Sequence, residues 1–286
     1  MRYEAPNTLD QAVALLAAEA GEVRVLAGGT DLLVQMKTDV IDPVLLVDIK
    51  GIAETRLIQE EAGGFRVGAA ATGAELKEHP RLKAVWPGVV EAANLIGSTQ
   101  VQGRATMGGN LCNGSPAADS VPALIAAGAK ASIVGPKGRR DVPVEDIMLA
   151  PRKLSLAKGE IIVSFLLPAK PANTGDAYLR FIPRTEMDIA VVGCGVCLTL
   201  DAKGICTAAR VSLGAVAARP LLVADAAKAL IGTKVDDAAM QKLDAAAQAA
   251  CRPIDDKRGT KEYRIKVAGV LARRATQIAL ERARKA

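Results

Sequence analysis

The stretch TMGGNLCNGSPAAD, residues 106–119, decides the fold expected for this chain. It holds two adjacent glycines between Thr and Asn side chains, and the carboxylate of Asp119 follows Asn110 by nine residues. The surrounding segment, Gly97 to Ser120, shows no helical or strand periodicity, so the sequence predicts a long loop, which inside a compact domain is usually functional. Donors for a pyrophosphate and an acceptor for ribityl hydroxyls would suit a flavin dinucleotide. The alternative is a purely structural Ω-like loop.

Another glycine pair lies earlier in the chain, in the first glycine loop AGGTDL, residues 27–32, between the predicted strand Val23–Leu26 and a short apolar stretch. Adjacent glycines let a ligand approach the backbone without a Cβ in the way, and a helix start behind them favours an anion. This spacing is not the dinucleotide pattern G-x-G-x-x-G, and a tight turn without a ligand is the alternative. Together the two glycine loops favour a phosphate-containing ligand, and neither provides a nucleophile with a base.

The remaining pattern predicts an α+β protein with three segments. Residues 1–52 form an α/β lobe that ends in the buried strand Val44–Ile49, and residues 53–170 form a second α+β lobe. A linker with Pro168 and Pro171 leads to residues 175–286, where strands at Ala177–Ile182, Ala190–Leu200 and Cys206–Leu213 precede helices. The helices are expected at Leu221–Leu230, Asp236–Ala250 and from Lys261 to the end.

The composition excludes several classes of protein. The 286 residues are 50% hydrophobic and 24% charged, which is enough apolar surface for a sizeable core and rules out a disordered chain. No uncharged apolar run reaches the ~18 residues of a membrane span, and no signal peptide is expected. Only 2% of residues are aromatic, which disfavours nucleic-acid binding by stacking. The formal net charge of +6 concentrates after Arg252, where a solvated helix face or an acidic protein partner is expected.

The cysteines and the single histidine limit the possible chemistry. Five cysteines without a secretion signal indicate free thiols and a cytoplasmic location. Cys194 and Cys197 are three residues apart on a predicted strand, so their side chains should point to opposite faces and hold no metal. His79 is the only histidine and is expected at the surface, so a histidine triad or a multi-histidine metal site is excluded. No catalytic residue and no metal ligand is assigned in this chain.

At the two glycine loops the chain resembles the FAD-binding medium subunit of the molybdenum hydroxylases, the carbon monoxide dehydrogenase and xanthine dehydrogenase family. The resemblance extends almost end to end, through Tyr3–Pro6, Gly159–Ile162, Arg184 with Asp188–Ala190, and Glu262–Arg264. It implies a two-lobed FAD-binding fold of the vanillyl-alcohol oxidase type plus a C-terminal three-stranded sheet with a helical bundle.

The resemblance also implies the residues that bind FAD. Ala27, Gly28, Gly29, Thr30, Asp31 and Leu32 would line one side of the pyrophosphate, and Thr106, Gly108, Gly109 and Asn110 the other, with Asn113 nearby. Asp119 would hold ribityl hydroxyls, Leu156 would pack on the isoalloxazine, Arg180 would lie near the pyrimidine end of the ring, and Ile189 beside it. The chain departs from the family at Ile189, where some relatives have Tyr, and at Gln102-Gly103, which replaces a frequent Arg-Asn pair.

In this family, electrons from a molybdopterin site in a large subunit pass through [2Fe–2S] clusters of a small subunit to FAD, and then to an external acceptor. The resemblance therefore implies both partner subunits, as a dimer of heterotrimers. Two alternatives stay open: a self-sufficient FAD-dependent reductase of similar fold, and a non-catalytic nucleotide-binding module.

Overall fold

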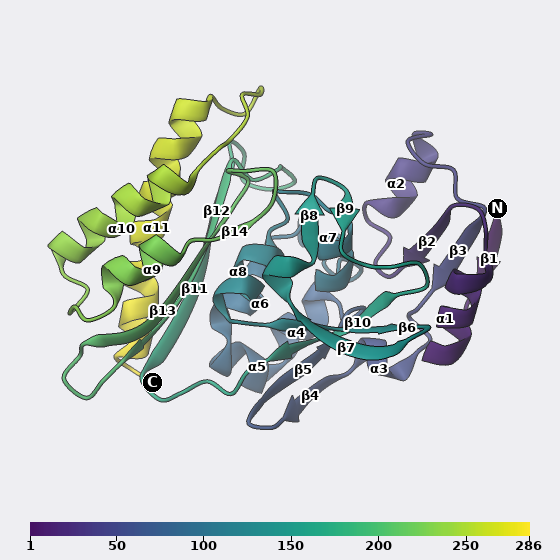
Figure 1. Cartoon of the computed structure of the whole chain (residues 1–286), viewed down its shortest axis with the longest axis horizontal. Helices are drawn as coiled ribbons and strands as arrows, with labels where there is room; N and C mark the ends of the chain where they lie inside the picture. The colour runs from purple at the N-terminus through teal and green to yellow at the C-terminus, as the bar shows by residue number, and fades with distance from the viewer.

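The computed structural model describes residues 1–286. Figure 1 shows an elongated molecule: the N-terminal sheet lies at one end, the C-terminal helices at the other, and a second sheet with short helices between them. The predicted α+β class is confirmed: two sheet-containing lobes precede a C-terminal domain that combines a sheet with helices. No helix is both long and apolar enough to cross a membrane.

The N-terminal lobe is built on a small parallel sheet in the order β1-β3-β2. Its elements are β1 (Arg2–Glu4), α1 (Leu9–Ala18), β2 (Val23–Leu26), α2 (Leu32–Lys37) and β3 (Leu45–Asp48). Every residue of β3 is buried, as expected for a nearly unbroken apolar run between two strands. The edge strand β2 leads directly into the first glycine loop, so the sheet fixes where that loop begins.

The second lobe carries an antiparallel five-stranded sheet in the order β4-β5-β10-β6-β7, with helices packed on it and a separate hairpin of β8 and β9. Its strands are β4 (Ile58–Glu61), β5 (Gly64–Gly68), β6 (Lys130–Gly135), β7 (Gly138–Pro143), β8 (Met148–Ala150), β9 (Lys153–Leu154) and β10 (Ile161–Leu167). Its helices are α3 (Ala53–Arg56), α4 (Gly73–Glu78), α5 (Pro80–Val85), α6 (Pro87–Ala93), α7 (Met107–Cys112), α8 (Ser120–Ala126) and the 3-10 turn η1 (Val144–Asp146).

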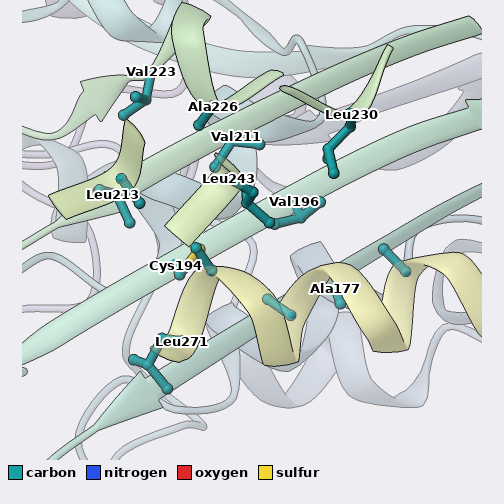
Figure 2. Packing of buried hydrophobic residues seen from close by; sticks show 14 of the residues in the cluster. Ala177, Cys194, Val196, Val211, Leu213, Val223, Ala226, Leu230, Leu243 and Leu271 are labelled. Carbon is teal, nitrogen blue, oxygen red and sulfur yellow. The ribbon is translucent and has the colours of Figure 1, made fainter. Parts of the chain in front are cut away.

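The C-terminal domain is an antiparallel sheet covered on one face by helices. Its elements are β11 (Thr174–Phe181), β12 (Val192–Leu200), β13 (Cys206–Gly214), β14 (Leu221–Leu222), α9 (Ala224–Leu230), α10 (Asp237–Ala250) and α11 (Lys261–Ala283). Figure 2 shows Val196 and Val211 of the sheet meeting Leu243 of α10 in the core between sheet and helices. The opposite face of the sheet packs on α6 and α8 of the second lobe.

Three sequence predictions were wrong in detail. The segment from Gly97 to Ser120 is not a continuous loop, because α7 lies within it; its two glycines concealed a helix that Thr106 caps. The C-terminal sheet has a fourth strand, because Leu221 and Leu222 pair with the open edge of β13 instead of starting a helix. The first strand of this domain, β11, begins at Thr174, three residues before the start predicted at Ala177.

The cysteine and histidine predictions had different outcomes. Cys194 is buried in the core under the helices, whereas Cys197 packs against the core of the second lobe, so the two thiols point to opposite faces as predicted. His79 is half-buried rather than at the surface. Its Nδ1 accepts a hydrogen bond from the backbone N–H of Leu82 at 3.1 Å, so this side chain caps α5. The predicted domain boundaries stay predictions.

Candidate functional site

A cavity of about 490 Å³ lies between the first glycine loop, α7 and the β8–β9 hairpin. The structure brings most of the predicted site residues together along its walls. The predicted residues that line it are Ala27, Gly28, Gly29, Thr30, Asp31, Leu32, Thr106, Gly108, Gly109, Asn110, Asn113 and Leu156. Its size falls within the range typical of cofactor sites.

The first glycine loop offers unused hydrogen-bond donors to this cavity. The backbone N–H groups from Gly28 to Asp31 donate no hydrogen bond within the protein, although these residues line the cavity. Gly28, Gly29 and Thr30 are half-buried and Asp31 is exposed, so these N–H groups are open to a ligand that enters the cavity. Consecutive free N–H groups of this kind bind phosphate oxygens well. The loop therefore fits the pyrophosphate of a dinucleotide.

The second glycine pair, Gly108-Gly109, differs from the first loop, because both of its N–H groups already donate hydrogen bonds within the protein. The Thr106 hydroxyl accepts a hydrogen bond from the N–H of Gly109 at 3.0 Å and so caps α7. The N–H of Gly108 donates to Ala69 O at 3.2 Å, and that of Asn110 to Thr106 O at 3.0 Å. These bonds fix α7 against the rest of the lobe, which leaves the side-chain amides of Asn110 and Asn113 as polar groups on this wall.

The two glycine loops touch each other directly. A Cβ on Gly28 would lie 2.1 Å from the carbonyl oxygen of Arg104, so no other residue fits here without a backbone shift. Gly28 is thus required by contact with protein backbone, rather than by the approach of a ligand as the sequence suggested. On the other side of the cavity, Gln35 Nε2 on α2 donates to Asn113 Oδ1 at 2.8 Å. These two contacts join the N-terminal lobe to the residues that precede and follow α7.

Three predicted residues do not line the cavity: Asp119, Arg180 and Ile189. Asp119 is buried and Arg180 Nη1 donates to its Oδ2 at 2.9 Å. Burial raises the pKa of Asp119 to about 6, although Arg180 and the Tyr178 hydroxyl act to lower it. Ile189 is 51% exposed on the loop before β12.

Sequence reasoning missed several cavity residues, among them Gln35, Ile96, Arg152 and Leu154. Gln35 could have been found, since it follows Asp31 by four residues and so shares that face of α2. Arg152 lies between β8 and β9 with φ of 60°, and no ion pair is formed by its guanidinium. Only the fold brings this hairpin to the cavity, so the sequence carried no signal for it.

The cavity contains no group suited to nucleophilic or metal chemistry. Cys112 is the one cysteine that lines the cavity, and no histidine lies there to deprotonate its thiol. No cluster of His, Cys, Asp and Glu could hold a metal ion. The site is built to bind a dinucleotide and to leave the chemistry to it.

Comparison with known proteins agrees with this assignment over the whole chain. Residues 1–170 match the family model described as FAD binding domain in molybdopterin dehydrogenase, and residues 177–279 match the CO dehydrogenase flavoprotein C-terminal domain. The chain is 36% identical to the carbon monoxide dehydrogenase medium chain of Afipia carboxidovorans, over 99% of this chain and 97% of that one.

Two further relatives extend the comparison. The chain is 33% identical to the putative xanthine dehydrogenase FAD-binding subunit XdhB of Escherichia coli, over 92% of this chain and 90% of that one. It superposes with a TM-score of 0.94 and 36% identity on a chain of reconstituted CO dehydrogenase from Oligotropha carboxidovorans, covering 99% and 98% of the two chains.

The fold and the cavity define an FAD-binding subunit of an oxidoreductase. More narrowly, the chain belongs to the FAD-binding medium subunits of molybdenum hydroxylases of the carbon monoxide dehydrogenase and xanthine dehydrogenase type.

Proposed function

We propose that this chain holds FAD between its glycine loops and carries electrons from partner subunits of a molybdenum hydroxylase to an external acceptor. The observation that carries the proposal is the row of free backbone N–H groups from Gly28 to Asp31 along the wall of the cavity. A bound flavin supplies reversible electron transfer, and the protein supplies binding, orientation and electrostatics.

Different residues of this chain bind different parts of FAD. The free N–H groups of the first loop bind the pyrophosphate, and the Asn110 side chain contacts it from α7. Leu156 packs on the isoalloxazine. This role is supported by its position, since it is half-buried, lines the cavity and packs against the core of the second lobe. Asp119 and Arg180 lie behind this wall, and their predicted contacts with the ribityl chain and the ring, like that of Ile189, are part of the proposal.

The electron route requires other subunits. The five cysteines are unpaired and none belongs to a metal-ligating cluster, so this chain supplies no thiolate set for an iron–sulfur centre. We therefore infer a small [2Fe–2S] subunit and a large molybdopterin subunit as partners, assembled as a dimer of heterotrimers. Relatives of this chain are themselves medium chains and FAD subunits of dehydrogenases, which supports this inference. The unpaired thiols also support a cytoplasmic location.

The proposal is tested by isolating the full chain with whatever copurifies and identifying both the released cofactor and the associated proteins by mass spectrometry. We expect one FAD per chain, together with an iron–sulfur subunit and a molybdopterin subunit. Release of FMN alone would contradict the pyrophosphate assignment. A chain that carries FAD but never associates with metal-containing subunits would favour the self-sufficient reductase.

A further inference from the structure

The C-terminal sheet holds α8, the helix behind the cavity wall, at both of its ends. At the C-terminal end, Arg210 of β13 donates from Nε to Ile125 O at 2.9 Å and pairs with Glu145. At the N-terminal end, Arg180 of β11 pairs with Asp119, the residue that precedes the helix. Each arginine thus forms an ion pair near one end of α8. Only the end at Asp119 is connected to a residue that lines the cavity.

A second side chain of β11, Tyr178, also forms a hydrogen bond with Asp119. The Tyr178 hydroxyl donates to Asp119 Oδ1 at 3.0 Å, while Arg180 takes Oδ2 and also donates to Leu95 O at 2.7 Å. Tyr178 is 3% exposed, and its ring packs with Ala92 and Ala123 between α6 and α8. Burial and the nearby Asp119 carboxylate raise the pKa of Tyr178 well above its usual value, so its hydroxyl stays a donor.

The residue next to Asp119 connects this buried pair to the cavity. Ser120 is fully buried and uses both its backbone N–H and its hydroxyl to donate to Asn110 Oδ1, at 3.0 and 2.7 Å. Asn110 lines the cavity. With its oxygen fixed twice, the Asn110 amide has one orientation, in which its NH₂ group is left for a ligand.

Backbone contact makes this support stiff. A Cβ on Gly195, which lies opposite Tyr178 on β12, would fall 2.4 Å from Pro122 O of α8. The sheet and the first turn of α8 therefore meet backbone to backbone, and α8 cannot shift without moving the sheet. A displacement of Asp119 would be passed to Ser120 and from there to Asn110.

We propose that Tyr178, on the first strand of the C-terminal sheet, is a positioning residue that orients the Asn110 amide toward FAD through Asp119 and Ser120. The inference rests on the proposed function, since it assigns the bound group as FAD. By this proposal the C-terminal domain contributes to cofactor binding indirectly, because Tyr178 does not itself line the cavity. Tyr178 isolates this relay better than Arg180 or Asp119, for which direct contacts with FAD are already proposed.

The test is a double-mutant cycle on FAD affinity in the full chain, with Tyr178→Phe, Asn110→Ala and the double variant. Loss of one hydrogen bond should weaken FAD binding ~3- to 10-fold in Tyr178→Phe. If Tyr178 acts through Asn110, Tyr178→Phe should have no further effect in the Asn110→Ala background. Titration of the apoprotein with FAD, followed by the change in the flavin absorption spectrum, measures each value.

Two controls separate positioning from stability. Tyr263→Phe makes the same change at a half-exposed ring and should leave FAD affinity unchanged. Arg210→Gln loosens the other end of α8 and should lower thermal stability without the loss of FAD affinity. Equal losses of affinity in Arg210→Gln and Tyr178→Phe, or additive losses in the cycle, would overturn the proposal. Wild-type chain that binds no FAD at all would instead contradict the proposed function.

Discussion

Gly28 and Arg104 meet backbone to backbone, and this contact joins the two glycine loops at the cavity. A Cβ on Gly28 would lie 2.1 Å from Arg104 O and 2.8 Å from Arg104 C. Neither atom belongs to a flexible side chain, so relief requires the loops to separate. The spacing of the loops, and with it the position of the free N–H groups from Gly28 to Asp31, depends on this one missing methyl group.

Gly28→Ala should therefore lower FAD affinity by on the order of 10-fold or more, because overpacking of this kind typically costs 1–3 kcal/mol. Isothermal titration of the apoprotein with FAD measures the loss. Gly103→Ala is the matched control, since a Cβ at Gly103 meets nothing within 4 Å. Unchanged FAD affinity in Gly28→Ala would show that the loop contact does not set the binding geometry.

Thr106→Ala should lower both stability and FAD affinity. Loss of an N-cap costs about 1 kcal/mol, and the freed Gly109 N–H would loosen α7 along the cavity wall. Thr106→Ser keeps the hydroxyl and should restore both properties. Thr8→Ala removes the equivalent cap of α1, which contributes no residue to the cavity. If chemical denaturation and FAD titration show that Thr8→Ala weakens FAD binding as much as Thr106→Ala does, α7 has no special role.

Arg152 should contribute to FAD binding through its charge. Arg152 lines the cavity and its guanidinium has no carboxylate partner, whereas Arg24, the other arginine there, pairs with Glu22. Arg152→Gln should weaken FAD binding ~3- to 10-fold at low salt, and the loss should shrink as salt screens the charge. Lys153→Gln, at the neighbouring position outside the cavity, should have no such effect. A loss in Arg152→Gln that is independent of salt would point to packing instead.

Asp119 should make stability depend on pH in a defined direction. Its pKa in the folded protein is about 6, above the ~3.9 of an unfolded chain. Between these values the folded state binds more protons, so stability contributed by Asp119 falls as the pH rises from about 4 to about 6. The free energy of unfolding of the wild type, relative to Asp119→Asn, should decline over this range by at most roughly 1.4 kcal/mol per pH unit. Urea denaturation at several pH values measures it, and a difference that rises with pH would contradict the assignment.

The sequence predicted much of the fold because local patterns were strong. The buried strand β3 and the meander of β11 to β13 follow from periodicity and turn chemistry within a few residues. The helix α7 was missed because glycines suppress helical propensity, and tertiary contacts such as Gly108 N to Ala69 O are what stabilise it.

Cavity residues that are adjacent in the sequence were predicted, whereas residues that reach the cavity from other parts of the chain were missed. The loop from Ala27 to Leu32 is contiguous, so its glycines and helix start could be read together. Arg152 reaches the same cavity from the β8–β9 hairpin, and nothing near it in the sequence indicates a ligand. Gln35 is different, because it follows Asp31 by one helical turn and could have been found from that spacing. Tyr178 lies even further from any motif, because its partner Asp119 precedes it by 59 residues.

The most direct test of the electron-transfer role compares flavin reduction in the isolated chain and in the assembled complex. Both are mixed without oxygen with a panel of aldehydes, purines and carbon monoxide, and loss of the visible flavin absorption is followed. We expect one substrate class to bleach the flavin in the complex and none to bleach it in the isolated chain, because this chain has no thiolate cluster and no metal-ligating site. Substrate-dependent bleaching in the isolated chain, with partner subunits shown absent by mass spectrometry, would contradict the account.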